Sequence, residues 1–401
     1  MIVMDREKLN QAIREVSRDR IVALASELIK IPSFTGEERR VAERAAELLK
    51  EKGIQTRKLG TDERPIVLGD INETAAPLIA LNGHLDTVPT GTRSTWNRDP
   101  FEPILENDHL LGRGSSDMKA SCAVIMHTLE ILKRYQNSLK GNVQAQLVPD
   151  EEKGGAAGTQ LLIDLMKHGK LTKPNYVIIG EKSDLKIRAA ERGIFRIDVR
   201  FKGRATHTAY ARVEGVNAIT MAAKAVLALE KPLEMWDPNL GHPVISVNMI
   251  KGGTVMNQVP DDCVISIDYR PVGGETIQSI TEHITSTLDK ISSDLSWKYE
   301  IEPAKDTQGK IAFTPANHTS PESTLVKAFQ SSIPDIMRTD PEFFVEWAGG
   351  TDGRHYREVG VETVGFGPKG EHAHGPNELV DVNSLETQAK IYLSVIFQLL
   401  S

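Results

Sequence analysis

Short apolar runs alternate with helical segments in the first half of the chain, and this alternation is the feature that most restricts the fold. The runs 77–81, 142–148 and 176–179 have the length and apolar content of buried strands. Between them, residues 117–135 and 158–169 have apolar side chains at helical spacing. Strands that alternate with helices form parallel sheets covered on both faces. We therefore predict an α/β domain with a mostly parallel sheet covered by helices.

The segment before the first of these strands is predicted to be helical. Residues 1–30 indicate one helix, and a second helix follows. Thr35 and Glu38 have the three-residue separation of a capping box, in which each side chain bonds the main-chain N–H of the other. Gly53 is expected to end that second helix, because glycine adopts the left-handed conformation common after a helix C-terminus.

The pattern changes from about residue 187. Residues 186–207, 244–253 and 261–272 alternate polar and apolar side chains, as half-exposed antiparallel strands do. Two helical stretches, 217–230 and 275–291, lie among them. This combination predicts a small α+β domain, an antiparallel sheet with two helices, inserted into the first domain.

The α/β pattern then returns, with a predicted strand at 362–368 and a closing helix at 383–401. We therefore predict a catalytic domain formed by residues 1–186 and 306–401, with the inserted domain at 187–305.

Composition excludes several classes of function. The net charge of -7 and the lack of a long Lys/Arg run argue against a nucleic-acid partner. An uninterrupted apolar stretch of about 18 residues, which would predict a membrane span, does not occur, and residues 1–20 do not resemble a secretory signal. Cys122 and Cys263 are far apart and belong to no CxxC pair, so we expect two buried free thiols and a cytoplasmic location.

Histidine and acidic side chains follow the ends of the predicted strands or begin the helix after them. In an open α/β sheet such positions meet in one crevice, the usual ligand site. Several carboxylates gathered there repel one another unless a positive charge lies among them. A divalent metal ion, or two, would supply that charge. The residues are His84, Asp86, Asp117, Asp150, Glu151, Glu152, Glu181, Asp184, His372 and His374.

The types of ligand restrict the choice of metal. Imidazole and carboxylate without thiolate suit zinc, cobalt or manganese, whereas calcium prefers oxygen ligands alone. Taken singly, each stretch is more often an ordinary loop than a metal site. Their joint occurrence at successive strand ends favours the metal site.

The same stretches resemble a known family. The segments are "LNGHLDTVP", "WNRDPFEP", "LLGRGSSDMKA", "VPDEEKGGAAGT", "IIGEKSD", "FKGRATHTAYARVEGVNAI", "IKGGTVMNQVPDDCVISIDYRP", "GGTDGR" and "FGPKGEHAHGPNE", within residues 81 to 378. In type and order they are similar to the metal-dependent peptidases and deacylases that include acetylornithine deacetylase, succinyl-diaminopimelate desuccinylase, aminoacylase and glutamate carboxypeptidase. The resemblance implies a catalytic domain with an inserted lid and dimerisation domain.

The resemblance also implies roles for the strand-end residues. His84 and Glu181 would bind one ion, Glu152 and His374 a second, and Asp117 would bridge both. The choice of His374 over His372 depends on the spacing of the family motif. Asp86 would orient the ring of His84 by a hydrogen bond, without binding the ion itself. Glu151 would be the general base, with its side chain directed away from that of Glu152 because we expect an extended segment there. The list of implied ligands and acids is therefore His84, Asp86, Asp117, Glu151, Glu152, Glu181 and His374.

Three residues of the inserted segment receive roles in the same way. His207 would reach the active site of a partner subunit and stabilise the oxyanion, which implies a homodimer. Asn257 and Arg270 would bind the carboxylate of the substrate, since a guanidinium suits a carboxylate well. Taken alone, Arg270 is better interpreted as one side of an ordinary surface ion pair, and the resemblance reverses that preference. The proline common in the family shortly after this histidine is missing from the chain.

The sequence thus predicts an enzyme, a hydrolase with two divalent ions, zinc first and cobalt or manganese as alternatives. It would cleave the amide bond of an N-acyl amino acid or a related small, carboxylate-bearing molecule. One alternative is a dipeptidase or aminopeptidase with the same ions. The other is a non-catalytic relative that keeps the fold and the metal site.

Overall fold

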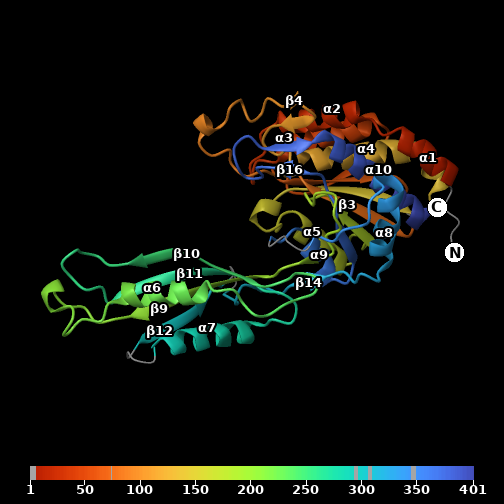
Figure 1. Cartoon of the computed structure of the whole chain (residues 1–401). Coiled ribbons are helices and arrows are strands. Elements are labelled where there is room, and N and C mark those ends of the chain that lie inside the picture. Colours follow the sequence, from red (N-terminus) through yellow and green to blue (C-terminus); the bar gives the residue numbers. More distant parts are fainter. Residues whose placement is uncertain (1–5, 74, 293–296, 306–308, 345–348) are drawn as a thin grey trace. The chain divides into compact units, whose positions relative to one another are not determined.

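The computed structural model describes residues 6–73, 75–292, 297–305, 309–344 and 349–401 (Figure 1). These residues form two compact units. Unit 1 comprises the described residues of Met1–Ala189, Thr319–Phe344 and Thr351–Ser401, and unit 2 comprises those of Ala190–His318 and Val345–Gly350. The domain boundaries predicted from the sequence, after residues 186 and 305, stay predictions, since compactness does not show which segments fold independently.

Unit 1 is built on a six-stranded sheet whose central strands are parallel. The strand β3 pairs in parallel with β6 and β7, and β7 pairs in parallel with β15, while β1 and β2 add an antiparallel edge. Buried central strands carry continuous apolar runs, and the edge strand β1 is largely exposed. In sheet order the strands are β1 (Gln55–Gly60), β2 (Pro65–Asp70), β6 (Asn142–Val148), β3 (Leu78–His84), β7 (Tyr176–Ile179) and β15 (Glu362–Gly365).

Helices cover both faces of this sheet (Figure 1). Apolar side chains of one sheet face share a core with six helices, and those of the other face share a smaller core with α5 and α9. The six are α1 (Arg6–Arg14), α2 (Arg18–Ile29), α3 (Arg39–Glu51), α4 (Lys119–Arg134), α8 (Thr324–Met337) and α10 (Val382–Leu400). The other two are α5 (Thr159–Lys167) and α9 (Gly353–Glu358).

A small four-stranded sheet in unit 1 was not expected from the sequence. Its order is β16-β17-β5-β4, and β17 pairs antiparallel with β5. The pairing of β5 with β17 joins the chain before Asp117 to the chain after His374. The strands are β4 (Ile104–Glu106), β5 (His109–Leu111), β16 (Gly370–Glu371) and β17 (Leu379–Asp381).

The helix termini correct two expectations. The single helix predicted over residues 1–30 is wrong in the described part, because Ser17 starts α2 as its N-cap, accepting the N–H of Arg20, and separates it from α1. The predicted capping box is also wrong. The hydroxyl of Thr35 donates to Asp86 at 2.9 Å instead, and the carboxylate of Glu38 accepts the N–H of Gly36.

The expected end of α3 at Gly53 is confirmed. Gly53 has φ +72°, and its N–H and that of Ile54 donate back to main-chain oxygens of the last helical turn. Both cysteines are buried and free, as predicted. Among the helices of the described residues, none is long and apolar enough to cross a membrane.

Unit 2 contains an antiparallel sheet of order β10-β11-β9-β12, with β13 paired to β9. Side chains alternate between buried and more exposed along β9 and β11, and their buried members pack with α6 and α7 into one core. The strands are β9 (Ile194–Lys202), β10 (Val244–Gly252), β11 (Asp262–Arg270), β12 (Lys298–Pro303) and β13 (Phe313–Thr314). The helices are α6 (Ala218–Leu229) and α7 (Ile277–Ser292).

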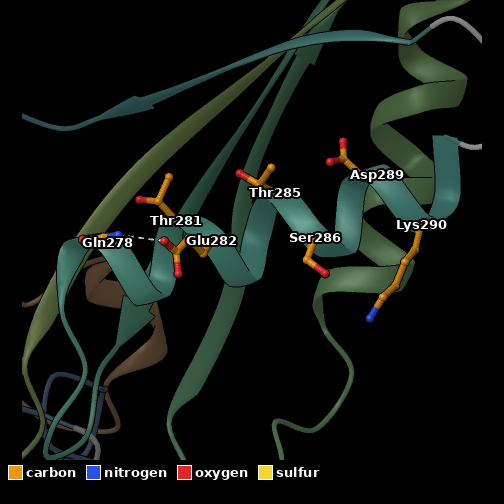
Figure 2. Close-up of a pocket in the computed structure, with 7 residues that line it drawn as sticks. All are labelled: Gln278, Thr281, Glu282, Thr285, Ser286, Asp289 and Lys290. Atoms are coloured by element: carbon orange, nitrogen blue, oxygen red, sulfur yellow. Dashed lines mark hydrogen bonds between the residues drawn. The ribbon is translucent and has the colours of Figure 1, made fainter.

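A short pairing of β8 (Ala190–Glu191) with β14 (Asn317–His318) completes the strands of unit 2. The surface of unit 2 has a pocket along α7, lined by side chains between Gln278 and Lys290 (Figure 2). Threonine, serine and charged side chains of one helix line it, and Gln278 donates to Glu282 at 2.8 Å within it. This is the polar face of an amphipathic helix, and none of the predicted site residues lines it.

Candidate metal centre

The five predicted ligands come from five separate segments of unit 1. His84 is the last residue of β3, Glu152 lies in the turn after β6, and Glu181 follows β7. The two other residues lie outside the main sheet, since Asp117 precedes α4 and His374 lies between β16 and β17. The carboxyl ends of the parallel strands β3, β6 and β7 therefore contribute three of the five, as expected at this edge of an α/β sheet.

Two groups of ligand atoms converge on Asp117. Its Oδ1 lies 2.9 Å from Nε2 of His84, which is also 3.2 Å from Oε1 of Glu181. Its Oδ2 lies 3.1 Å from Nε2 of His374, which is also 3.0 Å from Glu152. One carboxylate thus has one oxygen in each group, which is the arrangement needed to bridge two ions.

The general base candidate Glu151 lies beside the same atoms. One oxygen of Glu151 lies within 4.8 Å of potential ligand atoms of His84 and Glu181. Potential ligand atoms of His84, Asp117 and Glu152 form a second group in which all lie within 4.8 Å of one another. Glu151 and Glu152 lie in a 3-10 turn, Glu151–Lys153. The expected extended segment is therefore wrong, because Asp150 has φ +74° and turns the chain sharply after β6.

Asp86 connects this turn to the ring of His84. Its Oδ1 accepts the N–H of Glu151 at 3.1 Å, and its Oδ2 accepts the N–H of Glu152 at 3.3 Å. The nearest partner of the His84 Nδ1 atom is the main-chain oxygen of Asp86, at 2.9 Å, whereas the carboxylate is 3.5 Å away. The Nδ1–H of His84 therefore donates to that carbonyl, which leaves Nε2 to face the acids.

The remaining strand-end residues have other partners. Asp150 accepts from Arg64 at 2.5 Å and from the N–H of Ala157 at 2.9 Å. Asp184 pairs with Lys182 at 3.0 Å. His372 is more than half exposed, and its nearest acid is Glu371 at 3.8 Å. The positions of the two side chains therefore favour His374 over His372 as the metal ligand.

The acids of the site strongly perturb one another. Burial, followed by the charge of Glu181, holds the pKa of Glu151 well above its usual value. Burial, followed by the charge of Asp117, raises the pKa of Glu181. Hydrogen bonds to Asp117 and Glu152 raise the pKa of His374 to about 10. Acids gathered this closely repel one another unless positive charge lies among them, so these residues fit divalent cations.

Comparison with known proteins agrees with this geometry. Residues 80–398 match peptidase family M20/M25/M40. The chain belongs to this family. It is 29% identical over 353 residues to succinyl-diaminopimelate desuccinylase from Nitrosospira multiformis, covering 84% of this chain and 88% of that protein.

Solved structures share the fold of this family member. Aminopeptidase PepT from Bacillus cereus superposes with a TM-score of 0.75 at 19% identity, over 95% of this chain and 98% of that chain. The YXEP protein of Bacillus subtilis, described as a dinuclear metal binding peptidase from the M20 family, has a TM-score of 0.71 at 19% identity, over 96% of this chain and 98% of that chain. The predicted fold class is confirmed, and the protein is a metallohydrolase that acts on amide bonds.

The three predicted residues of the inserted segment lie in unit 2 of this family member. His207 is exposed just before a short 3-10 turn, and its Nδ1 accepts the N–H of Ala209 at 3.1 Å. Asn257 lies beside it, since its main-chain oxygen accepts the N–H of Thr208 at 3.0 Å. Arg270, at the end of β11, donates to both carboxylate oxygens of Asp268, at 2.5 and 3.1 Å. The roles of all three stay predictions.

The sequence did not single out Asp352, which is buried beside the turn of the candidate base. Its Oδ2 accepts the hydroxyl of Thr159 at 2.7 Å, and burial raises its pKa to about 6. A Cβ at Gly155 would come within 2.7 Å of its Oδ1, so this glycine allows the close approach. The sequence feature that could have identified Asp352 is an acid among small residues in "GGTDGR", one of the stretches on which the family resemblance depends.

Glu378 and Arg113 were also missed. They form a buried ion pair with 2.6 Å between Oε2 and Nη1, next to the loop of Asp117. Arg113 and Glu378 are 265 residues apart in sequence. The pairing of β5 with β17 helps to bring them together, and neither strand was predicted.

Proposed function

We propose that this protein is a deacylase that uses two divalent metal ions to release an acyl group from an N-acyl amino acid. The observation that carries the proposal is the position of Asp117, whose two oxygens face two separate histidine–carboxylate groups. His84, Asp117 and Glu181 would bind one ion, and Asp117, Glu152 and His374 the other. Zinc is the first candidate, and cobalt or manganese also suits these ligands. When bound there, the ions supply Lewis-acid activation of water and of the scissile carbonyl.

Glu151 is the proposed general base. It takes a proton from the attacking water and transfers it to the nitrogen of the leaving amine, after which the amide C–N bond has been replaced by a carboxylate and a free amine. Two features support this role. The hydrogen bond of its N–H to Asp86 fixes the turn, and its raised pKa suits a group that must carry a proton between two steps.

Residues of unit 2 are proposed to recognise the substrate. Arg270 and Asn257 bind its carboxylate, and His207 of a partner subunit stabilises the oxyanion. Asp268 already orients the guanidinium of Arg270 through two hydrogen bonds. The guanidinium has further N–H donors, so it can bind a substrate carboxylate while it keeps this pair.

A homodimer formed through unit 2 is part of the same proposal. Unit 2 exposes large apolar side chains on α6 and β10, where Leu227 is 76%, Ile250 52% and Met249 49% exposed. Among the described strands, β10 pairs only with β11, so its other edge has no strand partner there. Both features suit contact with a second copy. We also propose a cytoplasmic location, which the two free, buried cysteines support.

The test is a panel of acetyl, succinyl and aminoacyl derivatives of one amino acid, assayed with zinc, cobalt or manganese. We expect turnover that requires the metal and prefers an acyl derivative. In Glu151→Gln we expect kcat to fall by about 10²- to 10⁴-fold at unchanged metal content. Preference for the aminoacyl derivative would favour the aminopeptidase alternative. Full activity of Glu151→Gln, or turnover in the presence of a chelator, would contradict the proposal.

A further inference from the structure

The carboxylate of Glu378 is completely buried, and both of its oxygens are occupied by donors from one loop. Oε1 accepts the main-chain N–H of Ser116 at 2.8 Å and of Asp117 at 2.9 Å. Oε2 accepts the N–H of Gly114 at 2.9 Å and Nη1 of Arg113 at 2.6 Å. One side chain therefore fixes the main chain that ends at the bridging candidate Asp117.

Arg113 extends this contact to the other side of the site. It is 1% exposed, and its Nη2 donates to the main-chain oxygens of Pro89 at 3.3 Å and His374 at 3.4 Å. The guanidinium also lies 5.1 Å from the centre of the Trp96 ring, which covers it. The pair with Glu378 thus contacts the loops of two candidate ligands at once.

We propose that the Arg113–Glu378 pair is a positioning device that sets the distance between Asp117 and His374. The inference rests on the proposed metal-dependent function. Within this device all contacts to the two ligands are made to main-chain atoms, so the pair acts through the loops and leaves Oδ2 of Asp117 and Nε2 of His374 free to face each other at 3.1 Å. Burying two charges is costly, and charge-assisted hydrogen bonds of this number offset that cost.

The two ions should depend on the pair to different degrees. The pair contacts two of the three ligands of the second ion, Asp117 and His374, but only Asp117 among the ligands of the first. The other ligands of the first ion, His84 and Glu181, follow the central strands β3 and β7. Loss of the pair should therefore weaken the second ion more than the first.

The experiment compares Glu378→Gln with the unaltered protein in the full chain. Glutamine keeps the size but places an NH₂ group against an N–H or guanidinium donor. We would remove metal with a chelator, titrate zinc by calorimetry, and record the unfolding temperature of each protein. We expect two zinc ions per chain in the unaltered protein. In Glu378→Gln we expect one ion to bind about 10- to 100-fold more weakly and the other to keep most of its affinity.

Glu130→Gln is the matched control. Glu130 is also a buried acid, and it pairs with Arg20 at 2.5 Å between α2 and α4, where it contacts none of the candidate ligands. It should lower the unfolding temperature and leave both zinc affinities unchanged. A purely structural role of Glu378 would give the same result, so the selective loss of one ion distinguishes positioning from stability.

The outcomes separate the two proposals. Two tightly bound ions in folded Glu378→Gln would overturn the positioning role and leave the proposed function intact. Failure of the unaltered protein to bind zinc, cobalt or manganese would overturn both. If Glu378→Gln does not fold, Arg113→Lys decides, because lysine keeps the charge but cannot reach Glu378, Pro89 and His374 together. Weakening of one ion in Arg113→Lys supports the role, and unchanged affinity for both overturns it.

Discussion

At the residue scale, Asp86 shows how one carboxylate organises a site without facing its centre. It accepts hydrogen bonds from Thr35 and from the main-chain N–H groups of Glu151 and Glu152, while its own carbonyl oxygen orients His84. Burial alone would raise its pKa, but the nearby ring of His84 and the hydrogen bond from Thr35 lower it. Asp86 therefore stays charged and holds the base and a ligand in one arrangement.

His374 and His372 offer a matched pair of substitutions in one loop. His374 faces Asp117 and Glu152, whereas His372 is more than half exposed and pairs only loosely with Glu371, at 3.8 Å. We expect His374→Ala to lose one of two ions and to reduce kcat/KM by at least about 10²-fold, because it removes a metal ligand. His372→Ala should keep the metal content and activity of the unaltered protein. Metal analysis with steady-state kinetics checks both, and equal effects of the two substitutions would contradict the assignment.

At the element scale, the contact between α2 and α4 contains a second buried polar cluster. Arg20 donates to Glu130, and Nδ1 of His127 lies 3.1 Å from the same carboxylate. Nε2 of His127 accepts the N–H of Ser17 at 3.0 Å, so the ring proton is on Nδ1 and is donated to Glu130. The cluster links the N-terminus of α2 to the middle of α4.

Glu130 should make stability depend on pH. Burial raises its pKa, but hydrogen bonds from His127 and Arg20 outweigh burial and lower the pKa below the usual 4.5. A lowered pKa in the folded state stabilises the fold above the unfolded pKa, and this contribution disappears as pH falls. Glu130→Gln should therefore reduce the free energy of unfolding by about 2 kcal/mol at neutral pH, and by progressively less as the pH falls below 4.5. Urea unfolding measured at a series of pH values tests this, and a loss that stays constant with pH would refute it.

Elements that depend on local pattern were predictable, and those that depend on distant contacts were not. The runs at β6 and β7 were predicted with the observed bounds, because buried parallel strands are continuous apolar runs. The edge strand β1 carries mostly polar side chains, so it lacks the apolar run of a buried strand. The strands β5 and β17 have only three residues each, which is too short for a periodic pattern. Thr35 has the spacing of a cap, but its hydroxyl finds Asp86, 51 residues away, which sequence spacing cannot show.

The residues of the site also differ in whether local pattern or distant contacts determine them. The ligand candidates follow strands or motifs that the sequence marks clearly, and the structure brings all five together. Glu378 was quoted within "HAHGPNE", yet its contacts with the Asp117 loop require the pairing of β5 with β17. The ligand candidates and Asp86 were thus predictable, whereas Glu378 and Arg113, which hold the loop before Asp117, were not.

At the scale of the whole molecule, the exposed apolar side chains of unit 2 lead to a prediction about assembly. We expect the unaltered protein to sediment as a dimer and the double variant Leu227→Lys, Ile250→Lys to sediment as a monomer, because two charges would have to be buried at the interface. If His207 serves the neighbouring site, the monomer should be nearly inactive and still bind both ions. A fully active monomer would contradict the role of His207, and an unaltered protein that is already monomeric would contradict the dimer.

The discontinuity of unit 1 also affects the order of events during synthesis. A chain that is still being translated contains His84, Asp117, Glu152 and Glu181 long before residues 374–378 leave the ribosome. Until then, the loop before Asp117 has neither Glu378 to fix it nor β17 to pair with β5. A nascent chain can therefore offer acids to free cations, but the proposed two-ion geometry becomes available only after the residues of unit 2 have been synthesised.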